Sequence, residues 1–308
     1  MLDSLMLLLA IATQGQVATA PADNPQLARL VSPDASLTKQ ATGMSFTEGP
    51  IWMPEDGGYL IFTDMNNARL KRWDAKNGLS TFRDDAHNPN GNTRDLQGRL
   101  ITCEHTTRRV VIQEKDGTVR VLVDRLGDKK FNSPNDVVVK SDGTIWFTDP
   151  PYGLPRGTPR ELDKNYIFRL DPRDGSLKIV TDVVEGPNGL AFSPDEKRLY
   201  VADNGGPKNI HIFDVIDGST LKDAGILGKV DAGTPDGIKV DELGNVWSSQ
   251  TGGIIIFSPD ARLIGRIPVP EVPSNLCFGG EDGKTLFITA RASLYSIRVN
   301  VRGAPRGG

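Results

Sequence analysis

Six short motifs recur along the chain, and each places one polar residue at the start of an apolar run. The motifs are TEGPIW at Thr47, PNGNTRDL at Pro89, SPNDVVV at Ser133, GPNGLAF at Gly186, TPDGIKV at Thr234 and PSNLCF at Pro273. Their polar members are Glu48, Asn90 or Asn92, Asn135, Asn188, Asp236 and Asn275. Carboxylate and amide oxygens are the ligands that Ca²⁺ prefers, and they also suit Mg²⁺ or Mn²⁺.

Two of these motifs place a carboxylate at the ring position, Glu48 and Asp236. No Lys, Arg or His occupies the equivalent position in any motif. Two carboxylates buried together in a narrow channel would repel each other, and their unpaired burial would cost free energy. A divalent cation would supply the missing charge. Each motif taken singly could instead be a turn, as in x-P-N-D and x-P-D-G, but the recurrence at one repeat position favours the cation site.

The elements that carry these motifs repeat six times. In each copy a Gly- or Asp-containing turn precedes a short β-rich run, and equivalent apolar residues are Leu60, Leu100, Ile145, Leu199, Val246 and Leu286. Spacings of 40, 45, 54, 47 and 40 residues leave room in each copy for about four short strands. No long stretch has helical periodicity. The pattern predicts an all-β, six-bladed propeller with four-stranded blades, closed by a strand from residues 25–45. Two stacked β-sandwiches would explain the turns but not the repeat.

In a propeller the run after each motif is the innermost strand of its blade, so the polar residues face the central channel. The second strand then returns to the same face. The residues at its end should therefore line a pocket beside the cation. They are Asp64 and Met65, His105, Asp149 to Tyr152, Asn204, Gln250 and Thr251, and Arg291.

Composition excludes several classes of protein. The 308 residues carry 36 basic and 39 acidic side chains, well mixed, which argues against a nucleic-acid partner. The two cysteines, Cys103 and Cys277, make neither a disulfide framework nor a thiolate zinc site, and both are expected to be small buried residues. The sequence gives no indication of an oligomeric state.

The N-terminal residues 1–20 differ from the rest and resemble a secretory signal peptide. An apolar run from Leu5 to Ala12 is too short to span a bilayer, and Ala18-Thr19-Ala20 offers a cleavage site. We therefore expect a signal peptide, a single propeller domain over residues 21–308, and a periplasmic or secreted protein without membrane attachment. Without a functional signal the protein would be cytoplasmic.

The motifs together resemble the senescence-marker-protein/gluconolactonase/luciferin-regenerating-enzyme family, and most of all its bacterial gluconolactonase branch. The most specific stretches are RDLQGRLITCEH from Arg94, FNSPNDVVVKSDGTIWFTDPPYG from Phe131, and the pair GPNGLAFSPD and TPDGIKVDELGNVW. The resemblance covers roughly residues 40–300. It implies a propeller with a divalent metal in the channel, held by Glu48, Asn135, Asn188 and Asp236. The regucalcin-like branch has a substrate-contacting Arg where this chain has Ser133, so that branch does not predict the substrate.

The resemblance implies a lactonase that opens a sugar lactone, of the glucono-1,5-lactone type, to the aldonic acid. The metal, most readily Ca²⁺ with Mg²⁺, Mn²⁺ or Zn²⁺ as alternatives, would polarise the lactone carbonyl while water attacks. Asp236 is the candidate general base, and His105 could relay a proton or bind a sugar hydroxyl. The substrate contacts predicted beside these residues are His105, Asn92, Asp149, Tyr152 and Arg291.

Two alternative functions stay open at this point. No G-x-S-x-G nucleophile motif is present, which disfavours a covalent acyl-enzyme. The same metal site could serve a phosphotriesterase or aryl-esterase. A non-catalytic propeller that binds a ligand around a structural calcium would not need His105 or residues 149–152 on the metal face.

Overall fold

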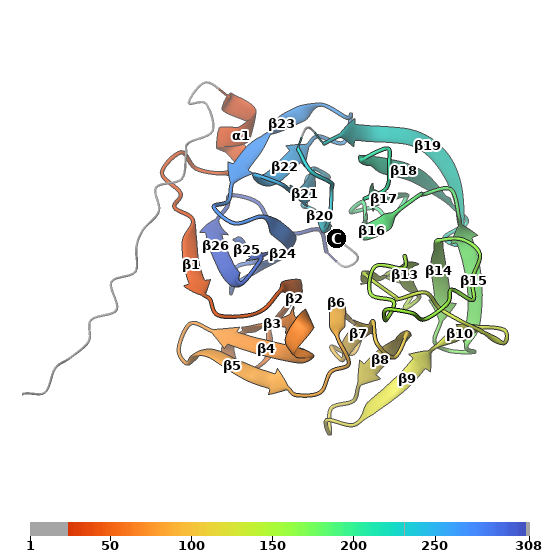
Figure 1. The fold of residues 1–308 in the computed structure, drawn as a ribbon. Coiled ribbons are helices and arrows are strands. Elements are labelled where there is room, and N and C mark those ends of the chain that lie inside the picture. The colour runs from red at the N-terminus through yellow and green to blue at the C-terminus, as the bar shows by residue number, and fades with distance from the viewer. Residues whose placement is uncertain (1–23, 231, 306–308) are drawn as a thin grey trace, which may run out of the picture.

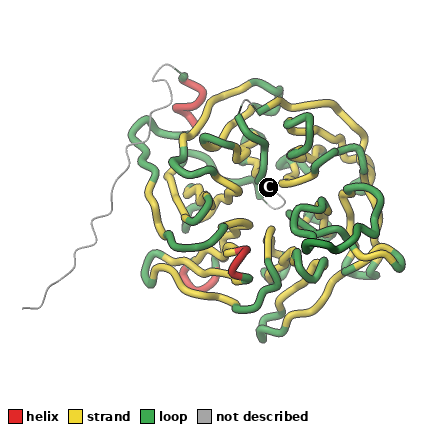
Figure 2. The backbone as a smooth tube through the Cα atoms, in the orientation of Figure 1, coloured by secondary structure: helices red, strands yellow, loops and turns green. Residues whose placement is uncertain are grey.

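Six four-stranded antiparallel sheets are arranged around a central axis (Figure 1). The structure, a computed structural model, describes residues 24–230 and 232–305. Strands and loops make up nearly all of the path in Figure 2. The predicted six-bladed propeller is confirmed. The predicted signal peptide, residues 1–20, lies outside the described residues.

Each blade is a meander whose strands run in order from the axis outward. The innermost strands are β2 (Thr47–Met53), β6 (Pro89–Arg94), β12 (Val137–Val139), β16 (Pro187–Phe192), β20 (Ile238–Val240) and β24 (Pro273–Gly279). The second strands are β3 (Tyr59–Asp64), β7 (Leu100–Glu104), β13 (Ile145–Asp149), β17 (Arg198–Asp203), β21 (Val246–Gln250) and β25 (Thr285–Ala290). The third strands are β4 (Arg69–Asp74), β8 (Arg109–Gln113), β14 (Tyr166–Asp171), β18 (Asn209–Ile216), β22 (Gly253–Phe257) and β26 (Ser293–Arg298). The outer strands are β5 (Gly78–Arg83), β9 (Val119–Val123), β15 (Ser176–Thr181), β19 (Thr220–Lys229), β23 (Leu263–Pro268) and β1 (Thr38–Ala41).

Helical structure in the described residues is short. It consists of α1 (Pro25–Leu30) and the 3₁₀ turns η1 (Glu55–Gly57) and η2 (Met65–Asn67). Outside the blades, β10 (Arg125–Leu126) and β11 (Lys129–Lys130) form a small hairpin. Over the described part of the chain, the structure contains no helix with the length and apolarity that a bilayer crossing requires.

The core lies between neighbouring blades. The six repeated apolar residues of the second strands are all buried. Large aromatic side chains join one blade to the next, as in Trp146–Phe192 and Trp247–Phe278, with ring centroids 5.3 and 5.4 Å apart. Both cysteines are free and buried in such clusters, as expected. This packing fixes the blades around the channel.

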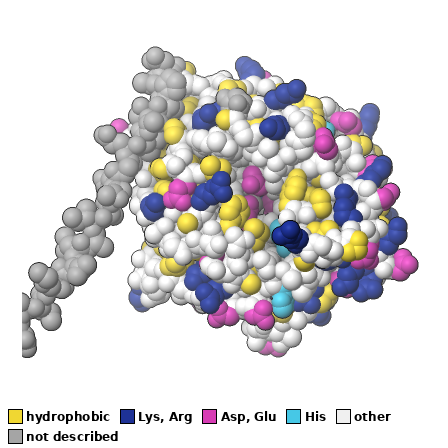
Figure 3. All heavy atoms as spheres, in the orientation of Figure 1, with side chains coloured by type: hydrophobic (Ala, Val, Ile, Leu, Met, Phe, Trp, Pro, Cys, Tyr) yellow, Lys and Arg dark blue, Asp and Glu magenta, His cyan; other side chains and the backbone are white. Residues whose placement is uncertain are grey.

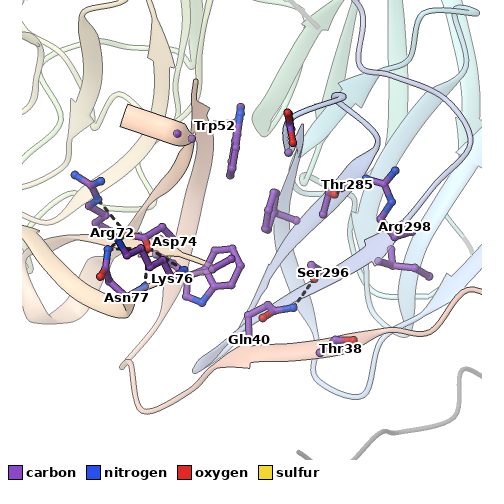
Figure 4. Close-up of a pocket in the computed structure, with 18 of the residues that line it drawn as sticks. Thr38, Gln40, Trp52, Arg72, Asp74, Lys76, Asn77, Thr285, Ser296 and Arg298 are labelled. Carbon is purple, nitrogen blue, oxygen red and sulfur yellow. Dashed lines mark hydrogen bonds and ion pairs between the residues drawn. The ribbon is translucent and has the colours of Figure 1, made fainter. Parts of the chain in front are cut away.

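The ring closes where the N-terminal strand β1 completes the sixth blade, as the sequence predicts. β1 pairs antiparallel with β26, and Gln40 Nε2 donates to Ser296 Oγ at 2.8 Å. Figure 4 shows the groove between this blade and the first, with Trp52 on its wall. The Trp52 indole stacks on Phe287, with centroids 5.4 Å apart and planes 10° from parallel. The first and last strands of the chain are thus held in one sheet.

Candidate active site

The residues of the six motifs meet at one end of the channel because each inner strand begins where the second strand of its blade ends. Glu48 pairs with Thr63, and Asn275 pairs with Thr289. Backbone hydrogen bonds between blades hold the ring together: Gly91 N–H donates to the Asn135 carbonyl and Gly189 N–H to the Asp236 carbonyl. The motif positions are therefore fixed relative to one another.

Glycine follows the ring residue in four of the six motifs because the inner strands crowd there. Gly49 has a φ of +45°, and a β-carbon on it would lie 2.0 Å from the Asn90 carbonyl oxygen. A β-carbon on Gly237 would lie 2.2 Å from Asn275 Oδ1. A larger residue at either position would push two blades apart.

A cavity of about 460 Å³ opens at this end of the channel. Figure 3 shows a hollow near the axis of the ring with acidic side chains in it. The lining residues are Phe46, Glu48, Met65, Asn66, Asn88, Asn90, His105, Thr106, Asn135, Tyr152, Gly153, Leu154, Pro155, Asn188, Asn204 and Asp236. The structure thus brings together all four predicted metal ligands and both His105 and Tyr152.

The two carboxylates of this cavity, a buried Glu48 and a half-buried Asp236, both have pKa values raised above the usual range. Burial raises the pKa of Glu48 to about 7; the Gly49 N–H opposes this shift, and the negative charge of Asp136 adds to it. Burial also holds the pKa of Asp236 well above its usual range, with further raising by Glu48 and Asp136. A cation placed between these oxygens would relieve both effects.

The arrangement of oxygens fits a hard divalent cation. Glu48 Oε2 accepts from Gly49 N and from Asn275 Nδ2, at 2.7 and 3.0 Å, which leaves Oε1 available toward the cavity. In the described residues, no group of three or more His, Cys, Asp or Glu side chains could hold a metal. The candidate donors in the cavity are the carboxylates of Glu48 and Asp236 and the amides of Asn135 and Asn188. Oxygen donors of this kind suit Ca²⁺, whereas softer metals prefer thiolate or imidazole ligands.

Lys239, which was not predicted as a site residue, supplies a positive charge below the ring. It lies on β20 at the floor of the channel, where its charge lowers the pKa of both Glu48 and Asp136. Asp136 Oδ2 is buried and has no hydrogen-bond partner among the described residues. The sequence did hold a signal, because the residue three positions after the ring member is uncharged in the other motifs. Those residues are Ile51, Thr93, Val138, Ala191 and Phe278.

His105 lies at the end of β7, with its imidazole on the cavity wall. It is 4% exposed, and Nε2 lies 3.0 Å from Asn90 Nδ2. Burial lowers the pKa of His105 to about 4, so the imidazole is neutral at neutral pH. It can accept, relay or share a proton there but carries no charge.

Asn90 rather than Asn92 is the cavity residue of the second blade. Asn92 Nδ2 donates to the Gly49 carbonyl at 2.7 Å, and its Oδ1 accepts from the Thr102 hydroxyl at 2.8 Å. Asn92 therefore joins two blades and lies outside the cavity lining.

Two further residues predicted to contact substrate also lie outside the lining. Asp149 is fully buried, and its Oδ2 accepts from Asn132 N at 2.8 Å. Burial raises the pKa of Asp149 to about 7. Arg291 is exposed in a turn, where its carbonyl accepts from Thr47 N at 2.7 Å. Both residues lie at the ends of second strands, as predicted, but neither lines the cavity.

Ser133 fixes the turn that forms one wall of the cavity. Its hydroxyl donates to the Pro150 carbonyl at 2.6 Å and accepts from Gly153 N at 2.9 Å. The turn carries Tyr152, whose hydroxyl lies beside Gly186 on the fourth blade. Burial raises the pKa of Tyr152, and the neighbouring carboxylates add to this effect. Ser133 therefore supports the wall of the cavity.

Comparisons with known proteins agree with the geometry. The SMP-30/Gluconolactonase/LRE-like region family matches residues 46–292. A gluconolactonase of Zymomonas mobilis is 33% identical over 91% of this chain and 86% of its own length. The 6-deoxy-6-sulfogluconolactonase of Pseudomonas putida is 30% identical over 83% and 92%, respectively. The solved structure of a gluconolactonase from Xanthomonas campestris superposes with a TM-score of 0.88 at 35% identity, covering 94% of this chain and 97% of that one.

Proposed function

Because the chain belongs to the SMP-30/gluconolactonase/LRE-like family, we propose that it is a lactonase that opens a sugar lactone of the glucono-1,5-lactone type. The product is the aldonic acid. The observation that carries this proposal is the convergence of two carboxylates and two amides with His105 and Tyr152 around one open cavity. A binding module built on a structural cation would not need the last two side chains there.

Glu48, Asn135, Asn188 and Asp236 would hold the cation, with Ca²⁺ as the first choice and Mg²⁺, Mn²⁺ or Zn²⁺ as alternatives. When bound, the cation supplies Lewis-acid polarisation of the lactone carbonyl. The fit rests on the all-oxygen donor set and on the raised pKa values of the two cavity carboxylates.

The chain's own groups then handle the protons. Asp236 accepts a proton from the water that attacks the carbonyl carbon, the bond from that carbon to the ring oxygen breaks, and the ring oxygen takes up a proton. His105 is neutral and can relay a proton or bind a substrate hydroxyl. Tyr152 and the turn fixed by Ser133 form the wall against which the sugar ring would lie.

The test is acid release from glucono-1,5-lactone in weak buffer at mildly acidic pH, where spontaneous hydrolysis is slow. Protein stripped with EDTA is compared before and after addition of each of Ca²⁺, Mg²⁺, Mn²⁺ and Zn²⁺. We expect activity to be lost on stripping and restored by at least one ion, and to be lost in Asp236→Asn.

Protein that binds the cation but hydrolyses no lactone would contradict the proposal. Activity on phosphotriesters or aryl esters, assayed in parallel, would then favour the esterase alternative. Inactivity on every substrate would favour a binding module.

We also propose that the protein is exported to the periplasm or secreted, on the basis of the apolar run and the Ala18-Thr19-Ala20 site. The N-terminus of the protein recovered from its natural host, read by mass spectrometry, tests this. A mature chain beginning at Pro21 is expected, and a chain that retains Leu5 to Ala12 would contradict export by cleavage.

A further inference from the structure

We propose that Asn275 is a positioning residue that determines which oxygen of Glu48 faces the bound cation. This inference rests on the proposed cation site. Asn275 occupies the ring position of the sixth blade, equivalent to the four proposed ligands, but it is buried and does not line the cavity. Its amide instead lies behind the ligand from the first blade.

The contacts of Asn275 fix the direction of its amide. Asn275 Oδ1 accepts from Leu276 N at 2.8 Å, so Nδ2 is left to point at Glu48 Oε2, 3.0 Å away. The backbone of Gly237 packs against Asn275 Oδ1 so closely that a β-carbon there would lie 2.2 Å from it. The side chain is 3% exposed and has no room to turn.

This amide decides how Glu48 can bind. Oε2 already accepts two hydrogen bonds, from Gly49 N and Asn275 Nδ2, and both of its good acceptor directions are used. Oε1 is the oxygen left for a cation, so the carboxylate would bind through one oxygen. Without the amide, one hydrogen bond is lost in a buried site and the carboxylate can rotate about its last bond.

Asn275 therefore contacts a proposed ligand from outside the cavity lining, with its Nδ2 3.0 Å from Glu48 Oε2. Partners of metal ligands that hold them in this way typically contribute about 10- to 100-fold in metal affinity.

The chain offers a matched control on the same strand. Ser274 Oγ donates to the Thr47 carbonyl at 2.6 Å, and so it also joins the sixth blade to the first. It touches backbone next to Glu48 but not the carboxylate. Ser274→Ala removes a hydrogen bond between the same two strands without releasing the ligand.

The test compares Asn275→Leu, Asn275→Ser and Ser274→Ala with the full-length wild-type protein. Ca²⁺ binding to EDTA-stripped protein is measured by calorimetry, and melting temperature is measured in EDTA. We expect both Asn275 variants to weaken Ca²⁺ binding by about 10- to 100-fold. Ser274→Ala should lower the melting temperature by a similar amount but keep its Ca²⁺ affinity within about twofold of wild type.

Equal Ca²⁺ affinity in wild type and a folded Asn275 variant would overturn the inference, as would equal weakening in Ser274→Ala. The Ser variant is the smaller change and keeps the test decisive if the Leu variant does not fold. Wild-type protein that binds no divalent cation would instead contradict the proposed function. The two failures are therefore distinguishable.

Discussion

The backbone of Gly153 packs directly on the imidazole of His105. A β-carbon at position 153 would lie 1.9 Å from His105 Nδ1 and 2.0 Å from Cγ. The turn that follows β13 therefore contacts the His105 side chain, which lies at the end of β7. Both belong to the cavity lining. The position of the imidazole depends on the absence of a side chain on its neighbour.

We predict that Gly153→Ala lowers kcat/KM on the lactone by roughly 10- to 100-fold, because either the imidazole or the wall must move by about an ångström. Melting temperature should change little, since the turn is at the surface. Steady-state kinetics on the single variants and on the pair Gly153→Ala with His105→Ala provide the measurement. Once the imidazole is gone, Gly153→Ala should have little further effect. Additive losses would show that the contact does not matter.

Ser133→Ala should loosen the turn that carries Tyr152. It removes the hydrogen bonds to the Pro150 carbonyl and from Gly153 N, each worth about 1 kcal/mol. We expect a severalfold rise in KM for the lactone with Ca²⁺ affinity unchanged. Ser258→Ala, which removes a comparable turn hydroxyl on the fifth blade, serves as the control and should leave KM unaltered. An unchanged KM in Ser133→Ala would mean that the turn holds its shape without the hydroxyl.

Cation binding should weaken as the pH falls. Burial raises the pKa of Glu48 to about 7, so below this pH the carboxyl holds a proton that a cation must displace. For one displaced proton the apparent affinity falls by up to about tenfold per pH unit on the acid side. Calorimetry with Ca²⁺ at about pH 6 and about pH 8, in buffers of different ionisation enthalpy, measures both the affinity and the proton release. Glu48→Gln should bind weakly at either pH. Equal wild-type affinity at both would be inconsistent with a protonated Glu48.

Trp52→Ala should destabilise the closure of the ring. The indole, labelled in Figure 4, stacks on Phe287. Gly58 and Gly279 lie against it, and β-carbons at these positions would come within 2.3 and 2.7 Å of the indole. The indole is half-buried, so its removal should cost somewhat less than the about 3–5 kcal/mol that loss of a fully buried indole typically costs. The free energy of unfolding from denaturant titration is the measurement, and Leu263→Ala, an exposed residue on β23, should stay within about 0.5 kcal/mol of wild type. A loss of the same small size in Trp52→Ala would show that the strand pairing of β1 alone closes the ring.

The ring of six polar residues could be located from sequence because the repeat places equivalent residues at equivalent points of each blade. Glu48, Asn188 and Asp236 follow from this spacing alone, together with the face on which they lie. The substrate contacts were predicted less completely. Asn92 on an inner strand, and Asp149 and Arg291 at the ends of second strands, do not line the cavity.

The physical reason is the backbone irregularity at the start of the inner strands. The pairing register shifts between Glu48 and Ile51, between Pro89 and Asn92, and between Pro187 and Leu190. Such shifts break the alternation of side chains along a strand. A period of two therefore does not tell which of two nearby residues faces the channel, and the structure decides for Asn90 over Asn92.

The sequence by itself determined the propeller, its closure by an N-terminal strand and the polar residues that converge on the cavity, because each blade is a local meander whose pattern repeats. The tertiary structure alone decided the contacts made between blades. The charge of Lys239 below the ring, the amide of Asn275 behind Glu48 and the packing of Gly153 on His105 each join segments far apart in the chain. Side-chain direction at these points depends on turns and register shifts that no local pattern encodes.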